Sequence, residues 1–171
     1  MNKIAKFEKV SYEQFKKDIV DNEFYIDEET TLRIYESIKL PKRATTGSAG
    51  YDFFSPFNIY LAVNNDVKIP TGIRCKIDDG WVLKEYPRSG HGFKYGVHMA
   101  NTVGIIDADY YYSDNEGHIF IKLVNDSVLA KDMQIDEGTA FCQGIFLPFG
   151  ITVDDEVTEV RNGGIGSTDK K

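Results

Sequence analysis

The sequence predicts a mostly β protein with a closed or sandwich-like arrangement of strands, preceded by one short helix. Between positions 57 and 149, short segments alternate apolar and polar residues with the period of two that strands require. Turn signals such as NND, DDG and DEG separate these segments, and this spacing is typical of all-β folds. A helical pattern precedes them, in the segment that begins at Ser11.

The predicted helix has a recognisable start. Ser11 and Gln14 have the spacing of a capping box, in which the side chain of the first residue accepts a hydrogen bond from the amide three residues later. Val10 and Phe15 stand at the positions of a hydrophobic staple. One face of the helix is expected to carry Tyr12, Phe15 and Ile19.

The predicted strands follow in order. The first is TLRIY (31–35), and the next is FNIYLAV (57–63), whose apolar positions 57, 59, 61 and 63 point one way. The remaining strands are VKIP (67–70), IRCKI (73–77), WVLKEY (81–86), HIFIKLV (118–124) and TAFCQGIFLPF (139–149). The segment PRSGHG (87–92) is predicted to be a loop between two of them.

Composition limits the function classes. The chain has 171 residues, the size of one domain, and is 42% hydrophobic and 27% charged, as in ordinary globular proteins. It lacks both an apolar run near the roughly 20 residues of a membrane span and a secretory h-region at its start, so we expect a cytoplasmic protein without a membrane partner. The net charge of −7 argues against nucleic-acid binding. Cys75 and Cys142 are expected to be reduced thiols in strands.

Three polar segments are candidates for chemistry. Asp52 follows a small Ala-Gly pair, Arg88 and Ser89 stand in a glycine-flanked loop, and Asp107 and Asp109 follow an apolar run. Glycine-flanked amides and an arginine can hold phosphate oxygens. Each segment also has a structural interpretation, because PRSGHG fits a tight hairpin turn and aspartates at strand ends often bind nearby amides.

Five motifs in order resemble those of the trimeric deoxyuridine triphosphatase (dUTPase) family. They are AGYDFFS, PRSG, NTVGIIDADY, GTAFCQG and RNGGIGST, and the resemblance runs from Leu40 to Thr168. It implies hydrolysis of dUTP to dUMP and pyrophosphate with Mg²⁺, by a homotrimer with active sites shared between subunits. It also implies a jelly-roll-like β-barrel (40–160) and a flexible C-terminal arm (161–171), and the predicted N-terminal helix and leading strand (1–39) lie outside it.

The resemblance implies a role for particular residues. Asp107 is the expected general base, which deprotonates the water that attacks the α-phosphorus. Tyr110 is expected to lie beneath the deoxyribose, where its ring excludes a 2′-hydroxyl, and Asp52 is expected to bind Mg²⁺ through water. The other expected substrate-binding residues are Arg88, Ser89, Gly90, Asn101, Gly104, Ile106, Gln143, Arg161, Ile165, Gly166 and Ser167.

These residues divide between the parts of the nucleotide. Asn101 and the backbone around it are expected to recognise the polar edge of uracil. Ser89 and Gln143 are expected to hold phosphate oxygens, and Arg88 is expected to pair with a carboxylate or with the phosphates. Ile165 stands where the family has an aromatic residue over the base.

The chain departs from the family pattern in four places. The stretch YYSDNEGH after Tyr110 is longer than usual, and its residues 114–117 are predicted to form an extended hairpin tip, with Tyr111 and Tyr112 in packing or interface roles. Ala140 replaces a frequent arginine, Ile165 replaces the aromatic, and Arg161 stands one residue nearer to it than is common. His91, His98 and His118 do not cluster by spacing, and we expect none of them to be catalytic.

Two alternatives remain beside the hydrolase. A dCTP deaminase would share the fold, but it needs an acid–base group where this chain has Lys122 in IKLVN. A nucleotide-sensing or protein-docking module would use the tyrosine-rich insertion as its docking edge. Lys122 argues against the deaminase, and the presence of Asp107 and Ser89 favours turnover over a binding module.

Overall fold

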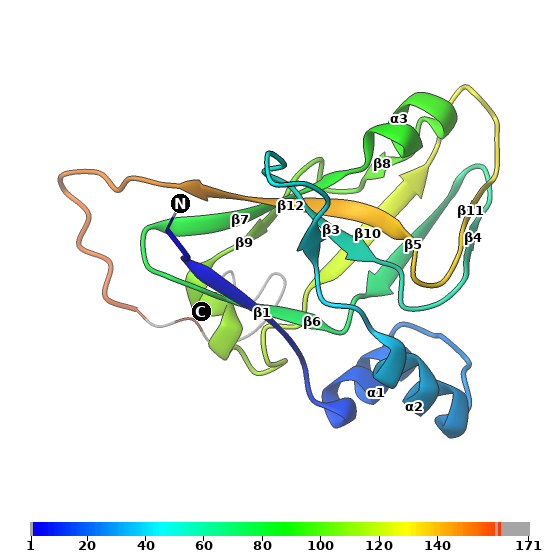
Figure 1. Ribbon diagram of the computed structural model, residues 1–171, viewed down its shortest axis with the longest axis horizontal. Coiled ribbons are helices and arrows are strands. Elements are labelled where there is room, and N and C mark those ends of the chain that lie inside the picture. The colour runs from blue at the N-terminus through cyan, green and yellow to red at the C-terminus, as the bar shows by residue number, and fades with distance from the viewer. Residues whose placement is uncertain (1, 160, 162–171) are drawn as a thin grey trace.

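The computed structural model describes residues 2–159 and Arg161, and strands predominate in it as predicted (Figure 1). The strands are β1 (Ala5–Lys9), β2 (Lys42–Arg43), β3 (Tyr51–Phe54), β4 (Ile59–Leu61), β5 (Asn65–Pro70), β6 (Ile73–Ile77), β7 (Trp81–Pro87), β8 (His98–Met99), β9 (Gly104–Ile106), β10 (Phe120–Asn125), β11 (Met133–Ile135) and β12 (Ala140–Pro148). The helices are α1 (Tyr12–Asp21), α2 (Glu28–Ser37), α3 (Ser89–Tyr95) and the 3₁₀ helix η1 (Ala108–Tyr112).

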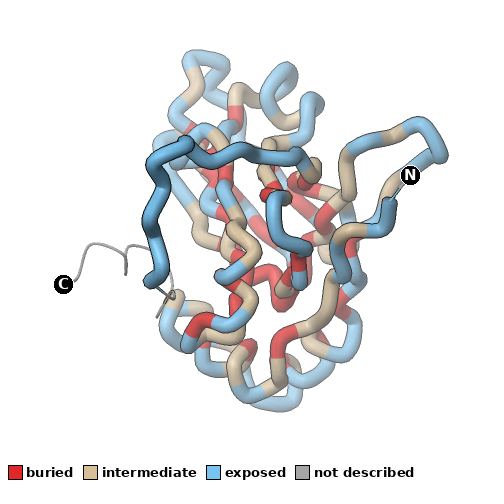
Figure 2. The backbone as a smooth tube through the Cα atoms, turned by 90° about the vertical axis from the view of Figure 1, so that its left-hand side faces the viewer, coloured by how far each residue is buried: buried red, intermediate tan, exposed pale blue. Residues whose placement is uncertain are grey.

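The strands form antiparallel sheets around one core. The largest sheet has the order β2-β3-β12-β7-β9, and a second has the order β5-β10-β8. Two pairs, β1-β6 and β11-β4, complete the described sheets. Buried residues gather along the middle of the molecule (Figure 2). The largest fully buried side chains include Phe15, Phe53, Ile69, Leu83, Ile121, Leu123 and Phe141.

Most predicted strands are confirmed. IRCKI coincides with β6, WVLKEY lies within β7, and TAFCQGIFLPF contains β12. VKIP is the second part of β5, and HIFIKLV contains most of β10. These two strands pair with each other. FNIYLAV is shortened to β4, although positions 57, 59 and 61 are buried as the alternation predicted.

The predicted strand TLRIY is wrong, because these residues lie in the helix α2. Asp27 caps this helix, and its carboxylate accepts a hydrogen bond from the Thr30 amide at 2.8 Å. Thr31 and Ile34, three residues apart, are buried on one face, as helical spacing requires. The N-terminal region therefore has two helices, which lie together beside the sheets (Figure 1), and it begins with the unpredicted strand β1, paired with β6.

The predicted start of α1 is confirmed, but only half of its capping box forms. Ser11 Oγ accepts a hydrogen bond from the Gln14 amide at 3.1 Å. The Gln14 side chain does not return to the Ser11 amide and instead donates to Asp18 Oδ2 at 2.8 Å. The Ser11 amide donates to Glu116 Oε2 at 2.8 Å, so a residue far along the chain completes the cap.

Two predicted loops differ in the structure. PRSGHG is not a hairpin turn, because the helix α3 begins at Ser89 and continues to Tyr95. Gly96 caps the end of this helix with a φ of 70°, which favours glycine. Residues 114–117 are not a hairpin tip either, since β9 pairs with β7 while β10 pairs with β5 and β8. They form a compact series of turns with positive φ at Glu116 and Gly117.

Both cysteines are free and buried in strands, as predicted. Burial raises the pKa of the Cys75 and Cys142 thiols, so both are protonated and unreactive at neutral pH. Of the helices that the described residues form, none is both long and apolar enough to span a membrane.

Candidate active site

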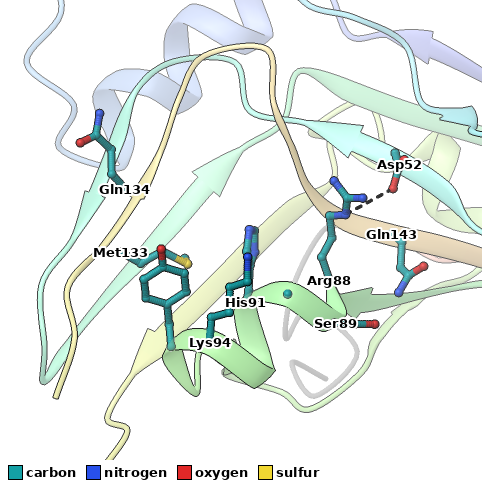
Figure 3. Close-up of a pocket in the computed structure, with 10 residues that line it drawn as sticks. Asp52, Arg88, Ser89, His91, Lys94, Met133, Gln134 and Gln143 are labelled. Carbon is teal, nitrogen blue, oxygen red and sulfur yellow. Dashed lines mark ion pairs between the residues drawn. The ribbon is translucent and has the colours of Figure 1, made fainter. Parts of the chain in front are cut away.

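A pocket of about 440 Å³ lies between α3 and the strands β3, β11 and β12 (Figure 3). Five predicted site residues come together in its lining, namely Asp52, Arg88, Ser89, Gly90 and Gln143. The other lining residues are His91, Lys94, Tyr95, Met133 and Gln134. Motifs that are 91 positions apart in the sequence therefore meet at one surface.

Strand pairing brings Asp52 and Gln143 together. They are direct partners in the β3–β12 pair, so their side chains leave the sheet on the same side. The Gln143 side chain donates to the Pro87 carbonyl at 3.4 Å. A Cβ at Gly50 would lie 2.8 Å from Gln143 Oε1, so a side chain there would displace the Gln143 amide.

Arg88 forms the positive side of the pocket. Its Nε lies 3.7 Å from Asp52 Oδ1, and its Nη1 donates to the Ala140 carbonyl at 3.3 Å (Figure 3). Lys94 follows on α3 and adds a second cation to the lining. Burial, with a smaller effect of Arg88, lowers the pKa of His91, so its imidazole is neutral at pH 7. A guanidinium, an ammonium, a hydroxyl and an amide around one space suit an anionic ligand.

Asp107 lies elsewhere, where β9 runs into η1. The Arg161 guanidinium bridges two carboxylates, with Nη1 at 3.3 Å from both Asp107 Oδ2 and Asp109 Oδ1. The Asp107 side chain remains 49% exposed, so water can reach it. Arg161 Cζ also lies 5.5 Å from the centroid of the Tyr110 ring. The guanidinium thus holds the two aspartates and the tyrosine together.

Tyr110 is turned into the protein. The side chain is buried, its hydroxyl donates to the His118 carbonyl at 2.7 Å, and Asn115 Nδ2 donates to that hydroxyl at 2.9 Å. Burial raises the pKa of this phenol, which therefore stays neutral. The orientation of the ring is fixed at its far end by these two hydrogen bonds.

The segment before Asp107 contains the predicted uracil-binding residues. Asn101 is exposed in the turn between β8 and β9, and Thr102 has a φ of 63° there. Gly104 pairs with Glu85 of β7, and its Cβ, if present, would lie 2.9 Å from Glu85 Oε2. Ile106 is the last residue of β9, so this strand leads directly into Asp107.

The two groups of candidate residues are separated within one chain. In Figure 1, α3 lies at the upper right, whereas β9 and the segment after it lie at the lower left. Among residues 2–159 and Arg161, no three His, Cys, Asp or Glu side chains form a metal cluster, and Asp52 is the carboxylate of the pocket lining. The predicted residues Ile165, Gly166 and Ser167 lie outside the described residues.

The sequence did not indicate five of the pocket residues, and three of these lie on α3. His91, Lys94 and Tyr95 line the pocket because α3 presents residues three or four positions apart on one face. From Arg88, the spacing to His91 and on to Lys94 and Tyr95 is the helical one. This helical spacing was visible in the sequence. The segment was predicted to be a loop, however, and residues three or four positions apart in a loop need not share a face.

Known dUTPases are similar to this chain in sequence and in structure. The dUTPase family model matches residues 36–169. The Deoxyuridine 5′-triphosphate nucleotidohydrolase of Lactococcus lactis subsp. lactis is 40% identical over 134 residues, which are 77% of this chain and 88% of that protein. A crystal structure of dUTPase from Streptococcus mutans superposes with a TM-score of 0.62 at 31% identity, covering 85% of this chain and 97% of that one.

A phage protein is similar in fold at lower identity. A mutant dUTPase from phage phi11 of S. aureus has a TM-score of 0.63 at 19% identity, over 92% of this chain and 98% of its own. That structure is described as showing how a structural Mg(II) ion is coordinated.

Proposed function

The chain belongs to the dUTPase family and is a dUTP diphosphatase, and we propose that the two groups of residues described above carry out its reaction together. The family match over residues 36–169 carries the assignment of activity. The roles of individual residues are supported by their grouping: a pocket lined by cations and neutral donors on one side, and the half-exposed Asp107 carboxylate at the end of β9 on the other.

Asp107 is the general base in this proposal. A base must lie within hydrogen-bond reach of the water that it deprotonates, and the half-exposed side chain of Asp107 is open to such a water. The water then attacks the α-phosphorus, and pyrophosphate leaves. Arg161 pairs with this carboxylate and places a positive charge beside it.

The pocket residues hold the triphosphate. Ser89 and Gln143 are neutral donors, Arg88 and Lys94 supply positive charge, and backbone at Gly90 lies at the same surface. Asp52 fits the Mg²⁺ role, because this ion keeps most of its waters and needs few protein carboxylates when phosphates bind it. When bound, the ion neutralises phosphate charge.

Uracil and deoxyribose bind at the turn between β8 and β9 and at the segment that follows it. Asn101 and the β9 backbone at Gly104 and Ile106 recognise the base, and Tyr110 lies against the sugar, leaving no space for a 2′-hydroxyl. Ile165, Gly166 and Ser167 of the C-terminal arm cover the bound nucleotide, with Ile165 over the ring.

A homotrimer with shared sites completes the proposal. The pocket and Asp107 lie apart in one chain, so a site that uses both requires residues from different copies. The segment after β12 supports this arrangement, because it runs outward from the sheets (Figure 1) and exposes Phe149, Ile151, Val153 and Val157. Another copy would cover these apolar side chains.

The activity is tested by measuring pyrophosphate release from dUTP, dCTP, dTTP and UTP with Mg²⁺. We expect rapid turnover of dUTP alone, and dCTP turnover at a matching rate would refute the assignment. Light scattering should give three times the mass of one chain. A monomer with full activity would refute the shared sites.

A further inference from the structure

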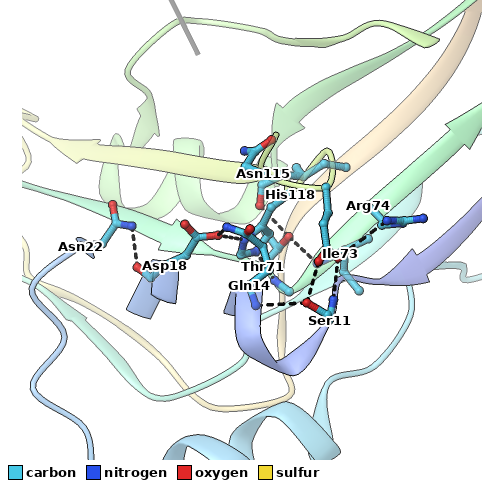
Figure 4. Close-up of polar contacts among 12 residues, drawn as sticks. Ser11, Gln14, Asp18, Asn22, Thr71, Ile73, Arg74, Asn115 and His118 are labelled. Carbon is cyan, nitrogen blue, oxygen red and sulfur yellow. Dashed lines mark hydrogen bonds and ion pairs between the residues drawn. The ribbon is translucent and has the colours of Figure 1, made fainter. Parts of the chain in front are cut away.

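The insertion after Tyr110 is anchored to the N-terminal segment. The Glu116 carboxylate accepts hydrogen bonds from the Ser11 amide at 2.8 Å and from the Ser11 hydroxyl at 2.6 Å (Figure 4). The His118 ring lies against α1, with Nδ1 2.5 Å from Asp18 Oδ2. These contacts join positions more than 95 residues apart and attach the insertion to both the cap and the body of α1.

The hydrogen bonds of His118 define its tautomer. The Gly72 amide donates to Nε2 at 2.7 Å, so this nitrogen carries the lone pair. The proton therefore lies on Nδ1, which donates to Asp18. His118 is fully buried and Asp18 nearly so, and a buried carboxylate is stable only when it is well paired. Asp18 also accepts from Gln14 Nε2 at 2.8 Å, which satisfies this need.

The same histidine is attached to Tyr110 by its backbone. The Tyr110 hydroxyl donates to the His118 carbonyl at 2.7 Å, and it accepts from Asn115 of the insertion at 2.9 Å. The hydroxyl is therefore held entirely by the insertion, whose own position depends on α1. A continuous chain of contacts runs from the side chain of Asp18 to the ring of Tyr110.

We propose that Asp18, His118 and Glu116 are positioning residues for Tyr110, so that helix α1 and the insertion together set the discrimination between deoxyribose and ribose. This inference rests on the proposed role of Tyr110 at the sugar. It gives the N-terminal helix and the long insertion a joint purpose. Loosening the network lets the ring move and admits a 2′-hydroxyl, while Asp107 retains its chemistry.

The first test compares two substitutions of one residue. Asp18→Ala removes the acceptor for His118, whereas Asp18→Asn keeps an oxygen at the same place. Asp18→Ala should lower the ratio of kcat/KM for dUTP over UTP by about tenfold or more, because displacement of a positioning group by about 1 Å can cost about a hundredfold. For dUTP, KM should rise more than kcat falls. Asp18→Asn should retain most of the native ratio.

Further variants separate positioning from stability. Glu116→Ala breaks the cap from the partly exposed side and should lower the ratio in the same direction, also if Asp18→Ala does not fold. Ile34→Val, a buried change in α2 outside the network, is the control for lost stability and should leave the ratio unchanged. Tyr110→Phe removes the hydroxyl that the insertion holds, so its effect should not multiply with that of Asp18→Ala.

Two results would overturn the inference. One is a native dUTP-to-UTP ratio, within about twofold, in folded Glu116→Ala and Asp18→Ala proteins; the other is full multiplication of the Asp18→Ala and Tyr110→Phe effects. A native protein that hydrolyses dUTP and UTP equally well would contradict the role of Tyr110 itself, and this inference with it. Native discrimination with insensitive variants would refute the positioning network alone.

Discussion

Glu85 makes the stability of this protein depend on pH in an unusual direction. It lies in β7, only 1% exposed, and neither carboxylate oxygen has a hydrogen-bond partner among the described residues. Its neighbours across the two flanking strands are Gly104 and Gly144, which contribute no polar side chain. Burial therefore raises the pKa of Glu85 to about 8, from an ordinary value of 4.5.

The direction and size of the effect follow from proton linkage. Between pH 4.5 and about 8 the folded protein holds a proton on Glu85 that the unfolded chain has released. The stabilisation is complete below the unfolded pKa and is lost as pH rises through the folded pKa. The slope reaches about 1.4 kcal/mol per pH unit, so raising the pH from 5 to 8 should cost about 4 kcal/mol. That is a large fraction of the roughly 5–15 kcal/mol that stabilise a domain.

Urea unfolding at pH 5, 6.5 and 8 measures this loss. With a slope of about 2 kcal/mol per molar urea, the native midpoint should fall by about 2 M over this range. Glu85→Gln cannot release a proton and should remove most of this fall, whereas exposed Glu156→Gln should not. Protein concentration must be constant, because subunit association contributes to stability. If native and Glu85→Gln proteins show parallel pH profiles, the carboxyl has an ordinary pKa and the reasoning is refuted.

Three further predictions concern the proposed site. Asp107→Asn should bind dUTP normally by calorimetry but lower kcat by about a hundredfold or more, because asparagine cannot take the proton; a near-normal kcat would place the base elsewhere. Tyr110→Ala should admit UTP, and unchanged discrimination in kcat/KM would exclude the ring as the steric barrier. Ile165→Phe should lower KM for dUTP several-fold, since stacking of a base on an aromatic is worth roughly 1–3 kcal/mol, while deletion from Asn162 onward should reduce kcat/KM greatly and leave the assembly intact. An unchanged KM for Ile165→Phe would contradict stacking, and full activity after deletion would remove any role of the arm.

The sequence predicted the parts of the fold that depend on local pattern. Period-two alternation located β6, where alternate residues are buried. The apolar runs located β7 and β12, in which adjacent residues are also buried. Alternation failed at TLRIY, because five residues are too few to distinguish it from the helical spacing of Thr31 and Ile34. Asp27 and the acidic residues after it are the start signal of α2, and they were the information needed to choose the helix.

Long-range contacts were beyond the reach of local patterns. The capping box predicted Gln14 as the partner of the Ser11 amide, yet Glu116, 105 positions away, occupies that place. A carboxylate is the stronger acceptor, and the turns of the insertion carry it to the helix start. The pocket around Asp52, Arg88 and Gln143 could be anticipated because the family motifs name its members. The network around His118 could not, since its members follow no motif.

Asn101 and Gly104 were both predicted to bind uracil, but the structure gives their identities different explanations. Gly104 has a packing explanation that needs no substrate, because a Cβ there would lie 2.9 Å from Glu85 Oε2 and 3.1 Å from Glu85 Cβ. A side chain at position 104 would force Glu85 to shift. Asn101 has no such explanation, since its side chain is exposed and makes no hydrogen bond to the rest of the described chain. Asn101 is therefore free to contact a ligand, whereas the packing of Gly104 already accounts for its identity, so glycine at position 104 is not evidence for a uracil site.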